Sequence, residues 1–562
     1  MLPSFRALAA QQALKLAVIG AGPSAFYASA RVLSHFPAGK ENECDVEVHM
    51  FERLPTPHGL VRYGVAPDHP EVKNVEHKFA EVAKDPRFHF YGNVNVGHSP
   101  TTSAAAYPLA NHVPLSSLLP HYTHVLFAYG SSLARPLGIP GSAPGELANV
   151  HSALDFVNWY NGHPVAHDPS LRRAGAASFE SFASHGRSLE HMTIIGAGNV
   201  ALDVARIVLR ASCSGLQGSD TPAARAYLAQ SDVPEPVLAA LSQSRINEVD
   251  IFARRGPAHV AFTNKELREM MALPGISFRP ADKTQLDEAE QLVERAEHEG
   301  TERGSAEAKS GARVKMRLLS LLAKGSQTKY DPAREGKSWG LNFFRAPAAL
   351  SGPKVQDGPA GPPRPVRQVT WNLTQLPNPR PVAAGAEASI VHDSRAWGNP
   401  APVNVPATGE QEKRPTDLVI SSIGYRSESI AEAAGDHDLP FDDSRAVVPN
   451  EGGRVTTLPQ GKVVPGHYVS GWLARGPVGV IASTMYDAYS VADLLVQDWQ
   501  QGVAQAHGGA DGLPAELRQP THKVVTYKDW QRIDSIEKER GAKLGKLREK
   551  ILTVQELLEV AS

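Results

Sequence analysis

The chain begins with a short apolar run that is followed by a turn signal and a helix signal. Residues 16–19 are all apolar, which predicts a strand buried in a parallel sheet. Gly20-Ala21-Gly22 predicts a tight turn, and the following Pro23 predicts the first turn of a helix. A second strand, predicted at 45–51, ends in Glu52, a position where an acid accepts the ribose hydroxyls of a dinucleotide.

The same pattern occurs a second time with a different ending. Residues 193–195 predict a strand, Gly196-Ala197-Gly198 a turn, and residues from Asn199 to Asp203 the start of a helix. The next strand, predicted at 248–253, ends in Arg254-Arg255 instead of an acid. Guanidinium groups bind a 2′-phosphate through charge-assisted hydrogen bonds worth roughly 1.5–3 kcal/mol each, whereas an acid repels it.

The two turns therefore predict different ligands, FAD at the first and NADPH at the second. The alternative is two chance glycine-rich turns, or one real site and one decayed copy. Strand, turn, helix and discriminating residue are all present in both units, so we favour two working sites.

Two later strands locate the connections between the predicted domains. Residues 123–130 and 416–425 each read as an apolar strand that ends at or near glycine. We expect an α/β fold with two Rossmann-like domains, in which the NADP domain (131–414) is inserted into a discontinuous FAD domain (1–130 and 415–562).

Two stretches look peripheral to these domains. Residues 347–414 are rich in proline, glycine and alanine and contain a strand-like piece at 368–373, so we expect loops and insertions at a domain edge. Residues 527–551 are highly charged, and we expect them on the periphery.

Composition narrows the functional classes. The 562 residues carry a formal net charge of −2, and no apolar run reaches the length of a membrane span, so neither nucleic acid nor a spanning segment is indicated. Only Cys44 and Cys213 are present, which excludes a redox dithiol and a cysteine-ligated cluster. The 22 histidines show no HExxH or paired spacing, so we expect no metal site. Arg6 without any acid before Glu41 fits a mitochondrial presequence remnant or an ordinary disordered terminus.

Three further segments are candidates for contact with a flavin. Leu60, in a loop rich in glycine and proline, is placed to lie against the ring, and Val96 to contact the adenine side. Gly479-Val480-Ile481 follows a predicted strand end and begins a helix, whose free N–H groups would stabilise negative charge on a reduced flavin. A simple strand–turn–helix closure explains the same residues.

Charged residues suggest two other sites. Arg313, Lys315 and Arg317 form a basic cluster on a predicted helix, and taken alone the cluster is better explained as a solvated helix flank. His69 beside Asp68 is either a polar pair near the chemistry or part of a turn.

Six longer motifs are more specific than either glycine-rich turn, and in this order they resemble the adrenodoxin-type ferredoxin:NADP reductases. The resemblance runs from about residue 16 to 500. The motifs are HGLVRYGVAPDHPEVKNV (58–75), GNVALDVARIVL (198–209), RRGPAHVAFTNKELREM (254–270), SWGLNFF (338–344), SSIGYRS (421–427) and SGWLARGPVGVIASTM (470–485).

The resemblance implies a flavoprotein that takes hydride from NADPH onto FAD and passes single electrons to a small acidic [2Fe–2S] ferredoxin. That ferredoxin would feed mitochondrial cytochrome P450 or iron–sulfur and haem pathways. Ser24-Ala25 departs from the family's usual Ala-Gly, and the 347–415 region is longer. Carried over, the FAD ligands are Ala21, Ser24, Glu52, Leu60, Val96, Trp472, Gly479, Val480 and Ile481; the NADP ligands are Ala197, Gly198, Asn199, Val200, Arg254, Arg255, Glu266 and Gly479; and Arg313 with Arg317 faces the ferredoxin.

The resemblance also implies a mitochondrial location, in the matrix or on the matrix face of the inner membrane, and we expect a monomer. As a hypothesis, His69 and Asp203 form a polar contact that relays a proton to the flavin. Two other readings remain: an FAD- and NADPH-dependent monooxygenase, and a non-catalytic nucleotide-binding protein.

Overall fold

The computed structural model describes most of the chain, including both predicted turns. Val480, Cys44 and Cys213 lie outside the described residues, as do most of the connection after residue 211 and most of the proline-rich stretch. The described residues are 13–37, 46–97, 107–171, 179, 189–211, 228–302, 306–333, 336–353, 363–376, 405–431, 439–479, 481–503 and 510–562.

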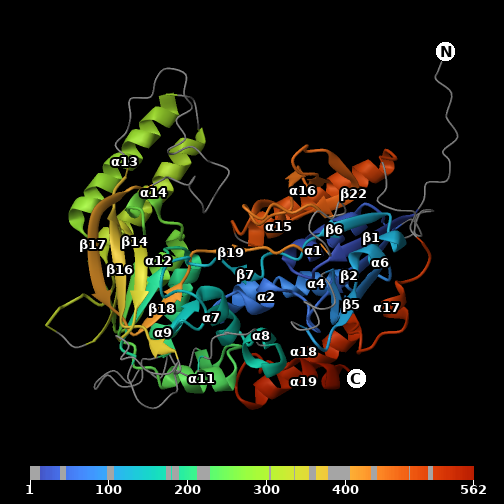
Figure 1. The fold of residues 1–562 in the computed structure, drawn as a ribbon, viewed down its shortest axis with the longest axis horizontal. Helices are drawn as coiled ribbons and strands as arrows, with labels where there is room; N and C mark the ends of the chain where they lie inside the picture. The colour runs from blue at the N-terminus through green and yellow to red at the C-terminus, as the bar shows by residue number, and fades with distance from the viewer. Residues whose placement is uncertain are drawn as a thin grey trace.

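The first lobe is built on a seven-stranded sheet that combines the beginning and the end of the chain (Figure 1). Helices α1 (Pro23–Ser34) and α16 (Ile481–Gln500) pack together against it and share one apolar core. The five consecutive strands from β22 to the edge strand β3 are parallel. From edge to edge the strands are β20 (Asn450–Glu451), β21 (Arg454–Thr456), β22 (Val463–Val469), β6 (His124–Phe127), β1 (Leu14–Ile19), β2 (Val46–Glu52) and β3 (Phe88–Gly92).

The second lobe is built on a six-stranded parallel sheet formed by the middle of the chain. The α/β class, with a second Rossmann-like unit inserted into a discontinuous first one, is therefore confirmed. From edge to edge the strands are β12 (Ile276–Arg279), β13 (Lys337–Asn342), β11 (Glu248–Phe252), β10 (His191–Ile195), β18 (Leu418–Ser421) and β9 (Val150–Ser152), with α7 (Ala153–Tyr160), α9 (Asn199–Ala211), α12 (Asn264–Met271), α13 (Lys283–Glu302) and α14 (Ala306–Lys324) in the same lobe.

The boundary predicted at residue 415 is wrong. Strand β18 pairs with β10 in the second sheet, with Met192 opposite Leu418, so the chain returns to the first lobe only after Ser421. A buried parallel strand has the same apolar pattern in either sheet, and the pattern cannot indicate which sheet it joins. The short pair β7 (Leu133–Ala134) and β19 (Tyr425–Arg426) lies where the two connections run side by side.

The proline-rich stretch contains more regular structure than predicted. The strand-like piece at 368–373 is confirmed as β16 (Gln368–Thr374), but it is the centre of an antiparallel sheet with β14 (Arg345–Ser351) and β17 (Ala407–Pro415). Trp371 of this sheet is fully buried and stacks on Phe252 of β11, with ring centroids 3.9 Å apart. The small sheet is therefore packed onto the second lobe.

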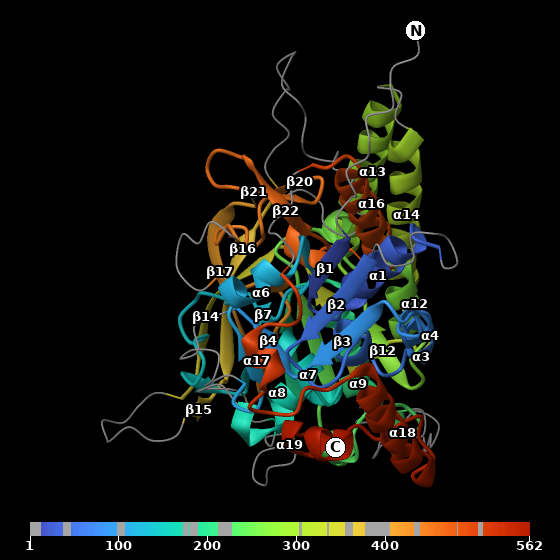
Figure 2. The same ribbon diagram turned by 90° about the vertical axis from the view of Figure 1, so that its right-hand side faces the viewer.

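The C-terminal segment is not peripheral. Helices α18 (Tyr527–Lys543) and α19 (Val554–Ala561) lie at the base of the molecule in both views (Figures 1 and 2). Glu537, which is 0% exposed, bonds Arg62 of the first lobe at 2.6 Å. Lys550 contacts Asp232 of the second lobe at 2.8 Å. Many of the charges that suggested a peripheral segment are thus paired, and several are buried between the lobes.

Shorter elements complete the chain. No helix among the described residues is long and apolar enough to cross a membrane. The remaining elements are α2 (Leu60–Tyr63), α3 (Pro70–Lys73), α4 (Glu76–Val82), β4 (Val94–Val96), β5 (Asn111–Val113), α6 (Leu115–Leu118), β8 (Leu147–Ala148), α8 (Pro164–His167), α11 (Glu235–Ser242), β15 (Arg364–Pro365), α15 (Trp472–Arg475) and α17 (Ala515–Arg518), together with short 3-10 turns.

Candidate active site

The first glycine-rich turn has the geometry of a phosphate-binding loop. Gly20 has a φ of +99°, and a Cβ there would lie 2.6 Å from the Cα of Tyr129, so only glycine fits. A Cβ on Gly22 would meet nothing within 4 Å, which leaves open space beside the start of α1. No side chain caps this helix, so its first N–H groups and its positive dipole end are free for an anion. These features fit a pyrophosphate.

Glu52 lies beside this turn, at the end of β2. Its Oε2 accepts a hydrogen bond from the N–H of Ala21 at 2.9 Å, and its Oε1 accepts one from the N–H of Leu54 at 3.1 Å. Burial raises the pKa of this carboxyl above its usual value, against the opposing effects of Arg53 and of the backbone donors. Each oxygen can accept a second hydrogen bond, so the carboxylate keeps capacity for ribose hydroxyls.

Two other predicted FAD residues, Leu60 and Val96, lie in different positions relative to the turn. The N–H of His58 donates to the carbonyl of Ala21 at 2.8 Å, which places Leu60, at the start of α2, beside the turn. Val96 is 5% exposed and packs in a core cluster with Ile19 and Phe51, so its side chain is part of the core below the turn.

Ser24 belongs to the contact between α1 and the end of β22, whereas Trp472 is the first residue of α15 and its ring centroid lies 5.9 Å from that of Tyr425. The Ser24 hydroxyl lies 2.7 Å from that of Ser470, and both are buried. A Cβ on Gly471 would come within 2.9 Å of the Ser24 side chain. The Ser24 hydroxyl therefore forms a hydrogen bond between α1 and the end of β22. The backbone of Ser24 lies in the first turn of α1.

The helix start predicted near Gly479 is confirmed, since α16 begins at Ile481. Gly479 has a φ of +88°, and a Cβ would lie 2.4 Å from the Oγ of Ser483, so glycine is required. Arg475 donates to the Oγ1 of Thr484 at 3.0 Å and ties α15 to the first turn of α16. The binding roles of Gly479, Val480 and Ile481 remain predictions.

The second turn repeats the geometry of the first. Gly196 has a φ of +112°, and a Cβ there would lie 2.2 Å from the carbonyl oxygen of Ser422. A Cβ on Gly198 would again meet open space at the start of α9. The Oδ1 of Asn199 accepts a hydrogen bond from the N–H of Thr263 at 2.9 Å, and the carbonyl of Ala197 accepts one from Ala261. The turn is thereby fixed against the segment that leads into α12.

Glu266, on the first turn of α12, has an unused acceptor. Its Oε2 is buried and has no hydrogen-bond partner within the described protein. A buried carboxylate oxygen without a donor costs free energy unless a ligand supplies one. An amide N–H such as that of a nicotinamide carboxamide fits this position. Val200, in the first turn of α9, packs half-buried at the edge of the second lobe's core.

A cluster of cations surrounds the end of β11. Arg254 is exposed and Arg255 half-buried, and burial together with the charge of Arg254 lowers the pKa of Arg255. Burial and the charge of Arg255 also lower the pKa of Lys315 on α14. Burial, Lys315 and Arg255 lower the pKa of His259 to about 4. No carboxylate in the described ranges pairs with these two arginines or with Lys315, so the cluster attracts an anion such as a 2′-phosphate.

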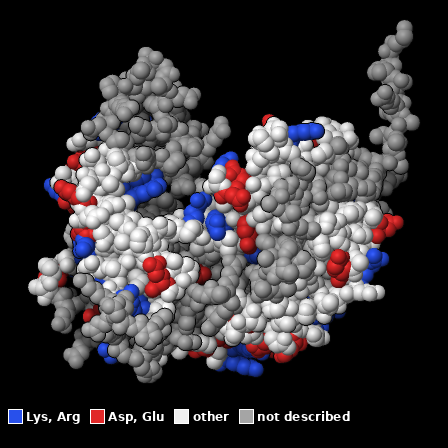
Figure 3. Space-filling view, in the orientation of Figure 1, with Lys and Arg blue, Asp and Glu red and all other residues white. Residues whose placement is uncertain are grey.

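The sequence predicts one basic cluster of Arg313, Lys315 and Arg317 on a single helix. The structure separates them: Lys315 is turned toward Arg255, whereas Arg313 and Arg317 are exposed on α14. Residues two apart on an α-helix point about 200° away from each other, so the spacing in the sequence already indicated that Lys315 lies on a different face from Arg313 and Arg317. Figure 3 shows a hollow between the lobes, with Lys and Arg surface on the left lobe and at the base of the hollow.

The direct contact predicted between His69 and Asp203 is not formed. His69 Nε2 lies 3.0 Å from Glu269, and its Nδ1 lies 3.1 Å from Glu71. Asp203 accepts from Arg206 at 2.8 Å instead. Burial raises the pKa of Asp203 to about 6, with Arg206 opposing the shift.

Arg206 explains why these groups lie close together. It is 0% exposed and forms a two-bond ion pair with Asp68, at 2.6 and 2.9 Å. Asp68 belongs to the first lobe and Arg206 to α9 of the second, so the pair joins the lobes beside the site. The residues are 138 apart in sequence, and no local pattern indicated the pairing.

Comparisons with known proteins cover nearly the full chain, although no family model matches it. The mitochondrial NADPH:adrenodoxin oxidoreductase of Salvelinus fontinalis is 36% identical and covers 97% of this chain and 91% of its own length. The protein of the same name from Arabidopsis thaliana is 32% identical, covering 100% of this chain and 98% of its own length.

A solved structure agrees with these relatives. FprA of Mycobacterium tuberculosis in complex with NADPH superposes with a TM-score of 0.71 at 31% identity, covering 98% of this chain and 100% of FprA. The similarity therefore extends over both lobes and both turns. The chain belongs to the NADPH:adrenodoxin oxidoreductase family.

Proposed function

We propose that the protein accepts hydride from NADPH on a bound FAD and passes the electrons singly to a small acidic [2Fe–2S] ferredoxin. The observation that carries the proposal is the pair of open glycine turns whose second strands end in opposite charge, Glu52 in the first lobe and Arg254-Arg255 in the second. One turn suits a ribose hydroxyl and the other a 2′-phosphate.

The chemistry depends on positioning. When bound, FAD supplies a group that takes up two electrons and releases them one at a time. The turn at Gly20 to Gly22 and Glu52 would hold its phosphates and ribose, and Gly479 to Ile481 would present a helix start to its ring. Arg254, Arg255 and Lys315 would hold NADPH by its 2′-phosphate, and Glu266 would orient the carboxamide.

The proposal is tested on the purified protein by its absorption and by titration with NADPH. We expect a yellow protein with one FAD per chain, and loss of the flavin absorbance on addition of one equivalent of NADPH without air. A colourless preparation that takes up no FAD, or a bound flavin that NADPH leaves oxidised, would contradict the proposal.

We propose that His69, with Nε2 3.0 Å from Glu269, and Asp203, which accepts a hydrogen bond from Arg206, each take part in proton transfer near this site without contacting each other directly. Replacing His69 with Gln should slow flavin reduction or reoxidation about tenfold or more, because the glutamine amide cannot take up a proton. Stopped-flow absorbance measures both rates. Unchanged rates of both reduction and reoxidation would contradict a proton-transfer role for His69. His77→Gln, at an exposed histidine, is the matched control.

Arg313 and Arg317 are proposed to attract the acidic ferredoxin. Both side chains are exposed on α14 and have no acidic partner among the described residues. Reversing both charges with Glu should lower kcat/KM for ferredoxin reduction at least about tenfold at low salt, because steering across a charged surface is lost. NADPH-dependent ferricyanide reduction should be unchanged.

The matched control for this prediction reverses two exposed lysines elsewhere, Lys78→Glu with Lys528→Glu, and changes net charge equally. Ferredoxin reduction by the unmodified protein should also slow as salt rises. A rate indifferent to ionic strength, or an equal loss in the control, would contradict a docking role for Arg313 and Arg317.

The location and assembly state belong to the same proposal. We infer that the protein works as a monomer in the mitochondrion, in the matrix or on the matrix face of the inner membrane. The relatives from Salvelinus fontinalis and Arabidopsis thaliana are named as mitochondrial, which supports this, whereas FprA is bacterial. The monooxygenase reading is not favoured; it requires NADPH oxidation coupled to an organic substrate without any ferredoxin.

A further inference from the structure

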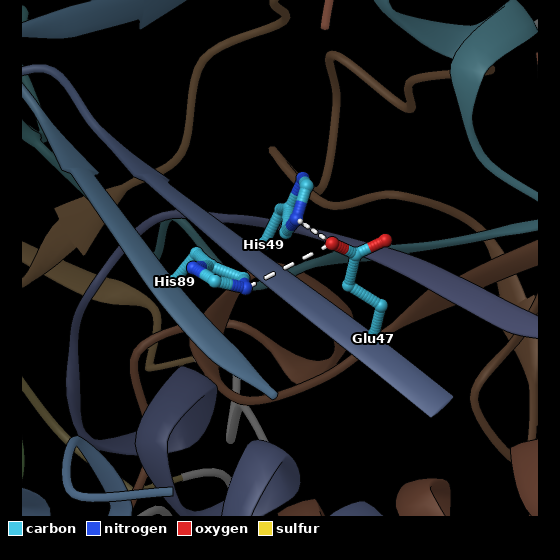
Figure 4. Close-up of side chains that lie close together, drawn as sticks. All are labelled: Glu47, His49 and His89. Carbon is cyan, nitrogen blue, oxygen red and sulfur yellow. Dashed lines mark ion pairs between the residues drawn. The ribbon is translucent and has the colours of Figure 1, made fainter. Parts of the chain in front are cut away.

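Three side chains with metal-binding groups lie on one face of the first sheet, away from both glycine turns. Glu47 and His49 are two residues apart on β2, so both point to the same face. His89 of β3 is the register partner of His49. The sheet geometry alone therefore brings a carboxylate and two imidazoles together (Figure 4).

The atoms that could bind a metal converge. Glu47 Oε1 lies 3.0 Å from His49 Nε2 and 3.8 Å from His89 Nε2. All three ligand atoms lie within 4.8 Å of one another. A tetrahedral Zn²⁺ with ligands at about 2.0–2.2 Å needs ligand–ligand separations of about 3.3 Å. Two of the three distances are thus within about half an ångström of that value.

The least exposed of the three ligands is held in place by a further partner. His49 Nδ1 lies 2.7 Å from the hydroxyl of Tyr122, and this hydroxyl is buried with it. With the proton on Nδ1, His49 donates to Tyr122 and presents the lone pair of Nε2 to the cluster. That Nε2 is buried, and the neighbour that the structure gives it is Glu47 Oε1, at 3.0 Å. A metal-binding histidine has this arrangement, with its other nitrogen fixed by a neighbour.

Space for a fourth ligand adjoins the three side chains. A cavity of about 210 Å³ lies over them, lined also by Lys15, Tyr91, His121 and Leu513. This volume is ample for an ion and its water. Lys15 also forms an ion pair with the exposed Asp511, at 3.3 Å.

A second group of similar composition differs because an arginine side chain contacts its carboxylates. His191, Glu248 and Asp250 also lie close together, but Arg279 donates to both carboxylates there. A guanidinium already supplies the positive charge of that cluster. In the cluster on β2 and β3 the nearby cation is Lys15, which helps to lower the pKa of Glu47 after the larger effects of the two histidines, whereas Arg279 bonds both carboxylates of the other cluster directly.

We propose that Glu47, His49 and His89 bind one Zn²⁺ ion, with a water molecule as fourth ligand. Two imidazoles and one carboxylate with an open position suit Zn²⁺ and not Mg²⁺ or Ca²⁺, which take oxygen ligands. Glu47 precedes Glu52 by five residues of an extended strand, about 16 Å, so the ion lies far from the FAD turn. Its effect is to join β2 to β3 and stabilise the first lobe, and it does not depend on the proposed electron transfer.

The test is the equilibrium binding of Zn²⁺ to the purified, flavin-loaded protein, measured by competition with a chromophoric chelator. We expect one Zn²⁺ per chain and a rise in melting temperature on addition of Zn²⁺. His89→Gln and Glu47→Gln should each weaken binding at least about 100-fold, and Tyr122→Phe about tenfold. Mg²⁺ at the same concentration should neither bind nor raise the melting temperature.

His77→Gln, which removes an exposed histidine outside the cluster, is the matched control and should bind Zn²⁺ like the unmodified protein. The side chains of Glu47 and His89 are each 44% exposed, so their replacement should leave the flavin spectrum and the fold intact. Absence of Zn²⁺ binding by the unmodified protein, or equally tight binding by His89→Gln and Glu47→Gln, would overturn the proposal.

Discussion

Replacing Arg254 and Arg255 together with alanine should lower kcat/KM for NADPH by a factor of roughly 10²–10³ and should change that for NADH by less than about threefold. Each guanidinium can form charge-assisted hydrogen bonds to the 2′-phosphate, roughly 1.5–3 kcal/mol each, and NADH has no such group. Neither arginine has an acidic partner among the described residues, so their removal leaves no buried carboxylate unpaired. Steady-state ferricyanide reduction with both coenzymes measures the effect.

Two further variants make this test specific. Arg268→Ala removes an exposed arginine on α12 and should leave the kinetics with both coenzymes unchanged. Adding Lys315→Ala to the double variant should lower kcat/KM for NADPH further, because its charge lies next to that of Arg255. Equal losses with NADPH and NADH would contradict the assignment of this cluster to the 2′-phosphate.

Replacing Asp68 with alanine should destabilise the protein by about 3–5 kcal/mol, the usual cost of leaving a buried charge without its partner. Arg206 is 0% exposed and donates two hydrogen bonds to the Asp68 carboxylate, at 2.6 and 2.9 Å. Asp203 and Glu269 still lie next to Arg206 in the variant and balance part of its charge, so we expect a destabilisation near the lower end of this range. Urea unfolding followed by flavin fluorescence and circular dichroism measures it.

The control for Asp68 is an ion pair at the surface. Glu81→Ala breaks a pair with Lys84 in which both side chains are more than two-thirds exposed, and should change stability by no more than about 0.5 kcal/mol. Because the Asp68–Arg206 pair joins the lobes, Asp68→Ala should also make the protein easier to cleave by protease between them. A loss no larger than that of Glu81→Ala would show that the pair contributes little.

Structural features that depend on neighbouring residues could be predicted from the sequence. Each turn couples a strand, two glycines and a helix start within about ten residues, and the conformations at Gly20 and Gly196 agree with what those glycines implied. The start of α16 after Gly479 was predictable for the same reason.

Features that depend on distant residues were not predictable. Strand β18 could have joined either sheet, since both accept a short apolar strand. The charge pattern of 527–551 indicated a peripheral segment, because no local signal shows that Glu537 contacts Arg62, 475 residues away. The same applies to the cluster on β2 and β3: Glu47 and His49 share a face by alternation, but His89 joins them only through strand register.

The central claim is that electrons from NADPH leave this protein one at a time to a [2Fe–2S] ferredoxin. It is tested most directly by NADPH-driven reduction of a cytochrome, with the purified protein at fixed concentration and an acidic [2Fe–2S] ferredoxin titrated from zero. We predict little reduction without the ferredoxin and a rate that rises to saturation with it. A rate that is the same with and without ferredoxin, from a protein that holds FAD and is reduced by NADPH, would contradict the account.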